Sequence, residues 1–175
     1  MGIKSKIIAF LVGFFSKEVV IILVATLPVF ELRLAVPLGI IKYNLPPAQV
    51  YILSLLGNLI PVIPLLLFYK YFFHKLEHIK FVGKFFRWWF RRVERKSKIV
   101  ERWGFWGLAI FVSIPLPVTG AWTGTVAATL VEMRIRKAFL AIAIGVAIAG
   151  IIMTILSIVA AETIKSWLAF VANNG

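Results

Sequence analysis

The sequence predicts an all-α integral membrane protein, an inverted repeat in which each copy is a re-entrant hairpin followed by a transmembrane helix. Basic amphipathic interfacial helices separate the copies. Apolar residues make up 61% of the 175 positions, and the mean hydropathy of +0.96 exceeds what a soluble domain of this length can bury. Two uncharged stretches are long enough to cross a bilayer. Two further apolar stretches are broken by prolines, glycines or charges, which membranes tolerate only where protein encloses the backbone.

The composition excludes several classes of function. The chain has no cysteine, which rules out disulfides, thiolate catalysis and cysteine-ligated metal sites. It has no aspartate and only seven glutamates, which removes most carboxylate-rich Mg²⁺ or Ca²⁺ sites. We therefore expect neither a metal nor a cofactor. The net charge of +13 is clustered beside apolar spans, so the expected partners are anionic lipid headgroups and not nucleic acid.

The first broken stretch, residues 26–39, carries the charges on which the functional interpretation depends. Glu31 and Arg33 lie in an apolar run, where an unpaired charge at membrane depth is costly. Pro28 and Pro37 each remove a helical hydrogen bond. We interpret the stretch as the tip of a re-entrant hairpin; the alternative is a kinked helix with the charged pair at the water interface. In an extended or broken tip, residues two apart can share one face, whereas on a helix they point apart.

The first predicted transmembrane helix is 48–69. Its 22 residues carry no charge and are long enough to span the bilayer. Asn58, Pro61 and Pro64 interrupt it, and Asn58 is assigned to helix packing in preference to substrate contact. The sequence leaves open whether residues 3–15, which include the apolar run 7–15, span the membrane or lie on it.

Residues 70–103 form a basic segment. Between positions 70 and 102 there are eleven Lys or Arg and only three Glu, and aromatic residues alternate with the bases. This pattern is typical of helices that lie in the headgroup plane, and the positive-inside rule places the segment in the cytoplasm. Residues 74–78 fit the H-x-x-E-H spacing of inverted zinc peptidases. A catalytic zinc also needs a third ligand and a cleft, so we assign no metal site.

The second broken stretch lies within residues 104–130, which carry no charge. Prolines and glycines at its centre cannot sustain a straight helix, namely Pro115, Pro117, Gly120 and Gly124. We predict a broken helix whose free amides and hydroxyls face a cavity; the alternative is a proline-kinked span packed by small residues. The candidate residues for that cavity are Thr119, Gly120, Trp122 and Thr123.

The two broken stretches belong to a repeat. Leu27-Pro28-Val29 recurs 89 positions later as Leu116-Pro117-Val118. A spanning helix follows each copy, the second at 138–161, after a charged cluster that contains Arg134 and Arg136. Because one cytoplasmic segment separates the copies, their spanning helices run in opposite directions and the copies are inverted. We therefore divide a single membrane domain, 1–175, into a first repeat (18–69), the basic segment (70–103) and a second repeat (104–161).

These motifs resemble a known family. Glu31-Leu32-Arg33 followed by Pro37, and then the run from Pro115 to Gly124, are similar to the small multidrug export proteins, which look like a distant branch of the DedA superfamily. The resemblance covers roughly residues 18–158. It implies two opposed re-entrant hairpins and a role in transport. DedA proteins are implicated in flipping a phosphorylated polyprenyl carrier lipid across the membrane, and their functional residues are membrane-embedded acids and arginines. The resemblance implies the same role here. The second hairpin here lacks the arginine, and the nearest are Arg134 and Arg136.

We therefore predict a transporter and not an enzyme, since no catalytic constellation is present. The leading substrate is a lipid phosphate such as the polyprenyl phosphate carrier, which Arg33 would bind bidentately in a pocket between the two hairpins. Glu31 would orient Arg33 or carry a coupling proton. The alternative is a small multidrug exporter of cationic or amphipathic compounds, with Glu31 as the counter-charge. Asn58, Arg134 and Arg136 are second-rank candidates. With two full spans, two copies can pair as a homodimer.

Overall fold

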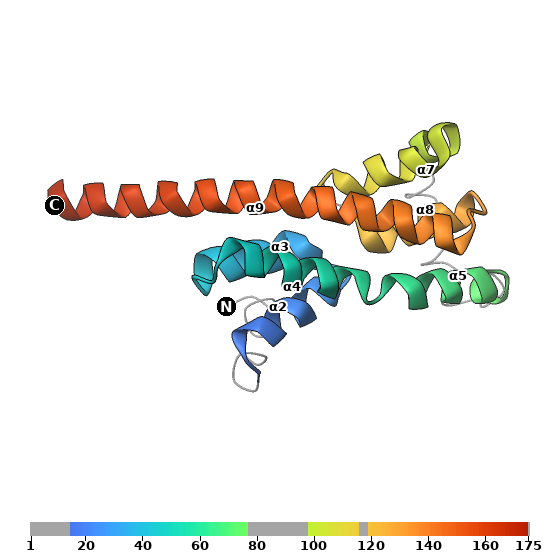
Figure 1. Cartoon of the computed structure of the whole chain (residues 1–175), viewed down its shortest axis with the longest axis horizontal. Helices are drawn as coiled ribbons and strands as arrows, with labels where there is room; N and C mark the ends of the chain where they lie inside the picture. Colours follow the sequence, from blue (N-terminus) through green and yellow to red (C-terminus); the bar gives the residue numbers. More distant parts are fainter. Residues whose placement is uncertain (1–14, 77–97, 116–118, 175) are drawn as a thin grey trace. The chain divides into compact units, whose positions relative to one another are not determined.

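The computed structural model describes residues 15–76, 98–115 and 119–174. Every secondary-structure element in these residues is a helix (Figure 1), which confirms the predicted all-α class. Several predictions lie wholly or largely outside the described residues. They are the segment 3–15, most of the basic segment 70–103, the H-x-x-E-H run and Pro117.

The described residues form two compact units. The first comprises residues 15–57 and 150–174, and the second comprises the described residues between 58 and 149. Each unit contains a pair of short helices separated by a break in the chain. The division into repeats at 18–69 and 104–161 concerns membrane topology and stays a prediction.

In the first unit, two short helices pack against each other. α2 (Lys17–Thr26) begins after Ser16, whose hydroxyl accepts a hydrogen bond from the Val19 N–H at 3.5 Å. α3 (Glu31–Pro37) packs against α2 and continues into the π-helical turn η1 (Leu38–Lys42). The two helices bury an aliphatic core made of Val20, Ile21, Val24, Leu32, Ala35 and Val36. Burial of these side chains holds the pair together.

The predicted helix 48–69 is two helices. α4 (Pro47–Leu59) and α5 (Val62–Leu76) are separated by a turn at residues 60 and 61. Pro61 accounts for the turn, because proline has no N–H to donate and its ring clashes with the carbonyl four residues earlier. Pro64 lies in the first turn of α5, where the missing N–H is tolerated.

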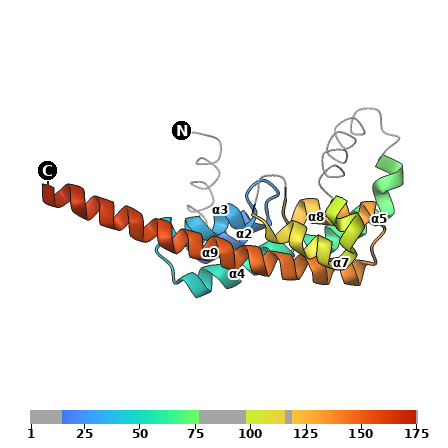
Figure 2. The ribbon, with the colours of Figure 1, turned by 90° about the horizontal axis from the view of Figure 1, so that it is seen from above.

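The second unit is organised around a short central helix, α8 (Ala121–Leu130). Both α5 and α7 (Lys98–Ser113) pack on it, and Figures 1 and 2 show α7 and α8 side by side. Gly104 breaks α7 with non-helical backbone angles. A Cβ added at Gly124 would lie 2.6 Å from Val112 Cγ2, so this glycine lets α7 and α8 approach closely. Gly124 itself is helical, and the predicted break falls before it.

The last helix is longer than predicted. We expected 138–161, whereas α9 runs from Ile135 to Asn174 as one continuous ribbon (Figures 1 and 2). The predicted end at residue 161 rests on the charges of Glu162 and Lys165, which follow it and lie inside α9. Both side chains are exposed, where charges do not interrupt a helix, and no proline or glycine follows them before residue 175.

Two stretches are long and apolar enough to cross a membrane, Pro47–Tyr71 and Ile135–Ala172. Only 33% of the most apolar window of each is buried, which is low for the core helix of a soluble protein. Exposed large apolar side chains recur every three or four positions, as on a helix face that contacts lipid: Ile52, Leu56, Ile60, Ile63 and Leu67 in one stretch, and Ile144, Ile148, Ile151, Ile155 and Val159 in the other. Together with the composition, these spans identify a membrane protein.

Candidate functional site

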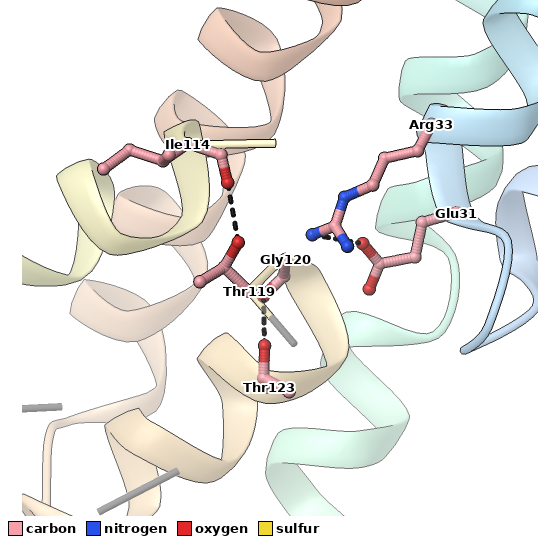
Figure 3. A network of polar contacts seen from close by, with 6 residues as sticks. All are labelled: Glu31, Arg33, Ile114, Thr119, Gly120 and Thr123. Atoms are coloured by element: carbon pink, nitrogen blue, oxygen red, sulfur yellow. Dashed lines mark hydrogen bonds and ion pairs between the residues drawn. The ribbon is translucent and has the colours of Figure 1, made fainter. Parts of the chain in front are cut away.

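Glu31 and Arg33 form an ion pair at the start of α3 (Figure 3). Arg33 Nη2 lies 3.7 Å from Glu31 Oε2. The Glu31 side chain is 7% exposed and the Arg33 side chain 26% exposed. Among the buried residues that the structure describes, Glu31 is the one that carries a charge. Charge-assisted hydrogen bonds are typically about 2.7–2.9 Å long, so this pair is a loose one.

The backbone of Glu31 explains how residues two apart meet. Its φ of +47° is in the left-handed region, which residues other than glycine rarely adopt. The Leu27 carbonyl accepts from the Phe30 N–H at 3.2 Å and from the Glu31 N–H at 2.9 Å, which closes a turn over Pro28. Proline suits this turn position because its φ is already fixed. The tip is therefore broken by a turn that leads directly into a helix, and the positive φ redirects the Glu31 side chain. The re-entrant hairpin itself stays a prediction.

Pro37 ends α3 in a widened turn. The Leu38 carbonyl accepts from the Tyr43 N–H at 3.0 Å, five residues later, which is the spacing of a π-helix. The break predicted at Pro37 is thus a change of helix type. The Tyr43 side chain is buried, and its hydroxyl finds no hydrogen-bond partner among the described residues. Burial raises the pKa of the Tyr43 phenol, so the hydroxyl keeps its proton at neutral pH.

In the second unit, the candidate residues surround the start of α8. Pro115 follows the end of α7, and Pro117 lies outside the described residues. Gly120, immediately before α8, has φ 140° and ψ −169°, a region that essentially only glycine adopts. Its carbonyl accepts from the Gly124 N–H at 2.8 Å and begins the helix. The chain is therefore non-helical at residues 114, 115, 119 and 120, and it resumes as a helix at Ala121.

The two threonines of this motif bind backbone carbonyls (Figure 3). Thr119 Oγ1 donates to the Ile114 carbonyl at 2.7 Å, across the break, and Thr123 Oγ1 donates to the Gly120 carbonyl at 3.3 Å. Both side chains are buried, and Trp122 is half-buried. Each hydroxyl oxygen keeps lone pairs that can accept a further hydrogen bond. The predicted pocket that joins these residues to Glu31 and Arg33 stays a prediction.

Polar groups on α4 add a feature that sequence reasoning found only in part. Asn58 is 1% exposed, and its Oδ1 has no hydrogen-bond partner among the described residues. Ser54, one helical turn earlier, is also 1% exposed with an unpartnered Oγ. The four-residue spacing was the signal that could have identified Ser54.

The remaining candidates are exposed. Arg134 and Arg136 flank Ile135, the first residue of α9, and both are exposed. Within the described ranges, no cluster of three His, Cys, Asp or Glu side chains could hold a metal ion.

Comparison with known proteins places the chain in a family. A family model described as "Putative small multi-drug export protein" matches residues 31–152, which is more than half of the chain. The match begins at Glu31 and includes Arg33, the motif around Gly120 and the first part of α9. No curated protein and no solved structure matches the chain. The chain therefore belongs to the family described as "Putative small multi-drug export protein".

Proposed function

We propose that the protein exports small cationic or amphipathic compounds across the membrane, with Glu31 as the counter-charge. The family supports a role in transport. The observation that favours a cationic substrate is the buried carboxylate of Glu31, held 3.7 Å from a more exposed guanidinium. A buried acid paired this loosely can give up its partner for another cation at a smaller loss than a tight bidentate pair would suffer.

Three cations compete for Glu31 in this proposal. They are Arg33, a proton and the charged group of the substrate. When the substrate leaves, Arg33 or a proton neutralises the carboxylate, so that no uncompensated charge remains buried. A proton taken up on one side and released on the other would couple transport to the proton gradient.

The second motif supplies groups of matching chemistry. The hydroxyl oxygens of Thr119 and Thr123 can accept hydrogen bonds from an ammonium group, and the Trp122 ring can attract a cation through its π face. The glycine-specific backbone at Gly120 keeps these side chains on one short turn. We propose that they contribute to the substrate path.

A lipid phosphate is the second candidate substrate. Arg33 is the reason to keep it, because its guanidinium is 26% exposed and matches a phosphate bidentately. This candidate corresponds to the DedA resemblance, with a polyprenyl phosphate as the carried lipid. It gives Glu31 the role of orienting Arg33.

Transport assays with the reconstituted protein distinguish the two candidate substrates. Purified protein in proteoliposomes is expected to move a cationic fluorescent dye faster than empty liposomes do, and to respond to an imposed pH gradient. The same vesicles carrying a fluorescent polyprenyl phosphate test the second candidate. Movement of the lipid with no movement of the dye would favour the second candidate over the first, and movement of neither would reject both.

We also propose a topology, in which the basic segment 70–103 is cytoplasmic and residues 42–47 and the C-terminus lie outside. The density of bases supports it through the positive-inside rule. Because the chain has no cysteine, single cysteines report sidedness directly. In inside-out vesicles, an impermeant maleimide should label Arg102→Cys, and Lys42→Cys only after the membrane is permeabilised. The reverse pattern would invert the topology, and labelling of both before permeabilisation would contradict a single span between them.

A further inference from the structure

A cavity of about 430 Å³ lies in the second unit, and neither Glu31 nor Gly120 is among the residues that line it. The middle of α5, the last turn of α8, and the loop and first residue of α9 form its walls. An adjoining hollow of about 330 Å³ shares Lys70, Arg134 and Ile135 with it and adds Arg136 and Lys137. The two hollows therefore adjoin, and together they are called the basic groove here.

The lining of the groove is chemically mixed. Its apolar members include Leu66, the ring of Tyr69 and Leu130. Its charged members are four bases, Lys70, Arg134, Arg136 and Lys137, and one acid, Glu132. All four bases are exposed, and within the described part of the chain none of them forms an ion pair. An excess of three positive charges is left for an anionic ligand.

The groove lies where both apolar spans end. Lys70 is next to the last residue of the span Pro47–Tyr71, and Ile135 is the first residue of the span Ile135–Ala172. Both residues line the same cavity, so the end of one span and the start of the other are at the same depth. In a bilayer this depth is that of the headgroups, where basic pockets beside apolar helices meet anionic lipid.

The loop that carries two of these charges has a fixed conformation. The Met133 N–H donates to the Ala128 carbonyl at 2.9 Å, and the Glu132 N–H donates to the Thr129 carbonyl at 3.0 Å. This pair of bonds is a Schellman motif, whose left-handed position usually holds glycine. Here Glu132 occupies it with a φ of +50°. The loop thus holds Glu132 and Arg134 in a defined place on the cavity wall.

We propose that this groove binds the phosphate headgroup of an anionic phospholipid, with the bases on the phosphate and the apolar lining residues against the start of an acyl chain. The volume suits a ligand group of that size, since pockets for small ligands measure about 300–1,000 Å³. A free phosphate would contact the bases alone and would leave the apolar lining residues exposed to water. The proposal does not depend on the export function.

Binding of dioleoylphosphatidylglycerol to the full chain in detergent, measured by native mass spectrometry, tests the proposal. The double variant Lys70→Gln/Arg134→Gln should bind this lipid at least tenfold more weakly, because each base lost near the membrane surface lowers the affinity about fivefold. Glu132→Gln should bind it several-fold more tightly, a gain that misfolding cannot produce. Met133→Trp should weaken binding by filling the cavity without changing its charge. Arg102→Gln, an exposed base of the same unit outside the groove, is the matched control and should change nothing.

Several results would overturn the proposal. Equal weakening by Arg102→Gln would show a diffuse charge effect with no site. Equal affinity for dioleoylphosphatidylcholine would remove the requirement for an anionic lipid. Full competition by glycerol phosphate at low concentration, with Met133→Trp without effect, would assign the groove to a free anion. If Glu132→Gln does not bind the lipid more tightly than the natural chain, Glu132 does not lie beside the bound phosphate, and the proposed site is wrong.

Discussion

Glu31→Gln should reduce transport of a cationic dye at least tenfold in proteoliposomes. The substitution keeps the size and hydrogen-bonding capacity of the side chain but removes its charge, so a substrate cation loses its counter-charge in a buried place. The residual transport should also lose its dependence on pH, because glutamine does not titrate. Initial rates of dye movement across a series of pH values, at equal protein content, give both results.

Arg33→Lys distinguishes the two candidate substrates. Lysine keeps the positive charge but lacks the planar fork that binds a phosphate bidentately. If the substrate is cationic, Arg33→Lys should be mild and Glu31→Gln severe. If the substrate is a lipid phosphate, the order reverses for that lipid.

Glu18→Gln is the matched control for these variants, since Glu18 is a carboxylate of the same unit in the first turn of α2. It should leave both activities unchanged. Normal transport of both substrates by Glu31→Gln and by Arg33→Lys would show that the start of α3 is not the site. A parallel loss in Glu18→Gln would point to general destabilisation of the unit.

Local chemistry made the breaks in this chain predictable. Pro28, Pro61, Pro115 and Gly120 all mark interruptions that the structure contains, because a proline beyond the first turn removes a helical donor and glycine favours non-helical backbone. The class of each element and the two apolar spans followed in the same way. The end of α9 was predicted too early, because exposed charges were read as a boundary although they do not stop a helix.

The remainder depends on contacts that no local pattern encodes. The proximity of Glu31 and Arg33 was expected from an extended or broken tip, but the left-handed residue at a helix start that produces it was not. Gly124 was expected to break a helix, and it serves to let Val112 approach. In both cases the deciding interaction joins residues whose geometry is set by tertiary packing, where propensity is a weak guide.

The partner of the Gly57 carbonyl is the clearest such case. In a continuous helix this carbonyl would accept from the N–H of residue 61, but that residue is Pro61 and has none. Thr26, at the end of α2, donates its hydroxyl to the Gly57 carbonyl at 2.9 Å. The same hydroxyl contacts the Ile22 carbonyl in its own helix at 2.9 Å. A side chain 31 positions away thus occupies the place of the donor that the proline removed.

Thr26→Val should lower the free energy of unfolding by about 2–3 kcal/mol, because it keeps the shape of the side chain and leaves the Gly57 carbonyl without this donor. Thr26→Ser retains the hydroxyl and should cost clearly less. Thermal unfolding in detergent, followed by circular dichroism, measures both variants.

A double-variant cycle tests the cause of the Thr26→Val loss. Pro61→Ala supplies an N–H that can donate to the Gly57 carbonyl, so Thr26→Val should cost less in the Pro61→Ala background than in the natural chain. If Thr26→Val costs the same in both backgrounds, the threonine acts through packing alone and the proposed substitution of donors is wrong.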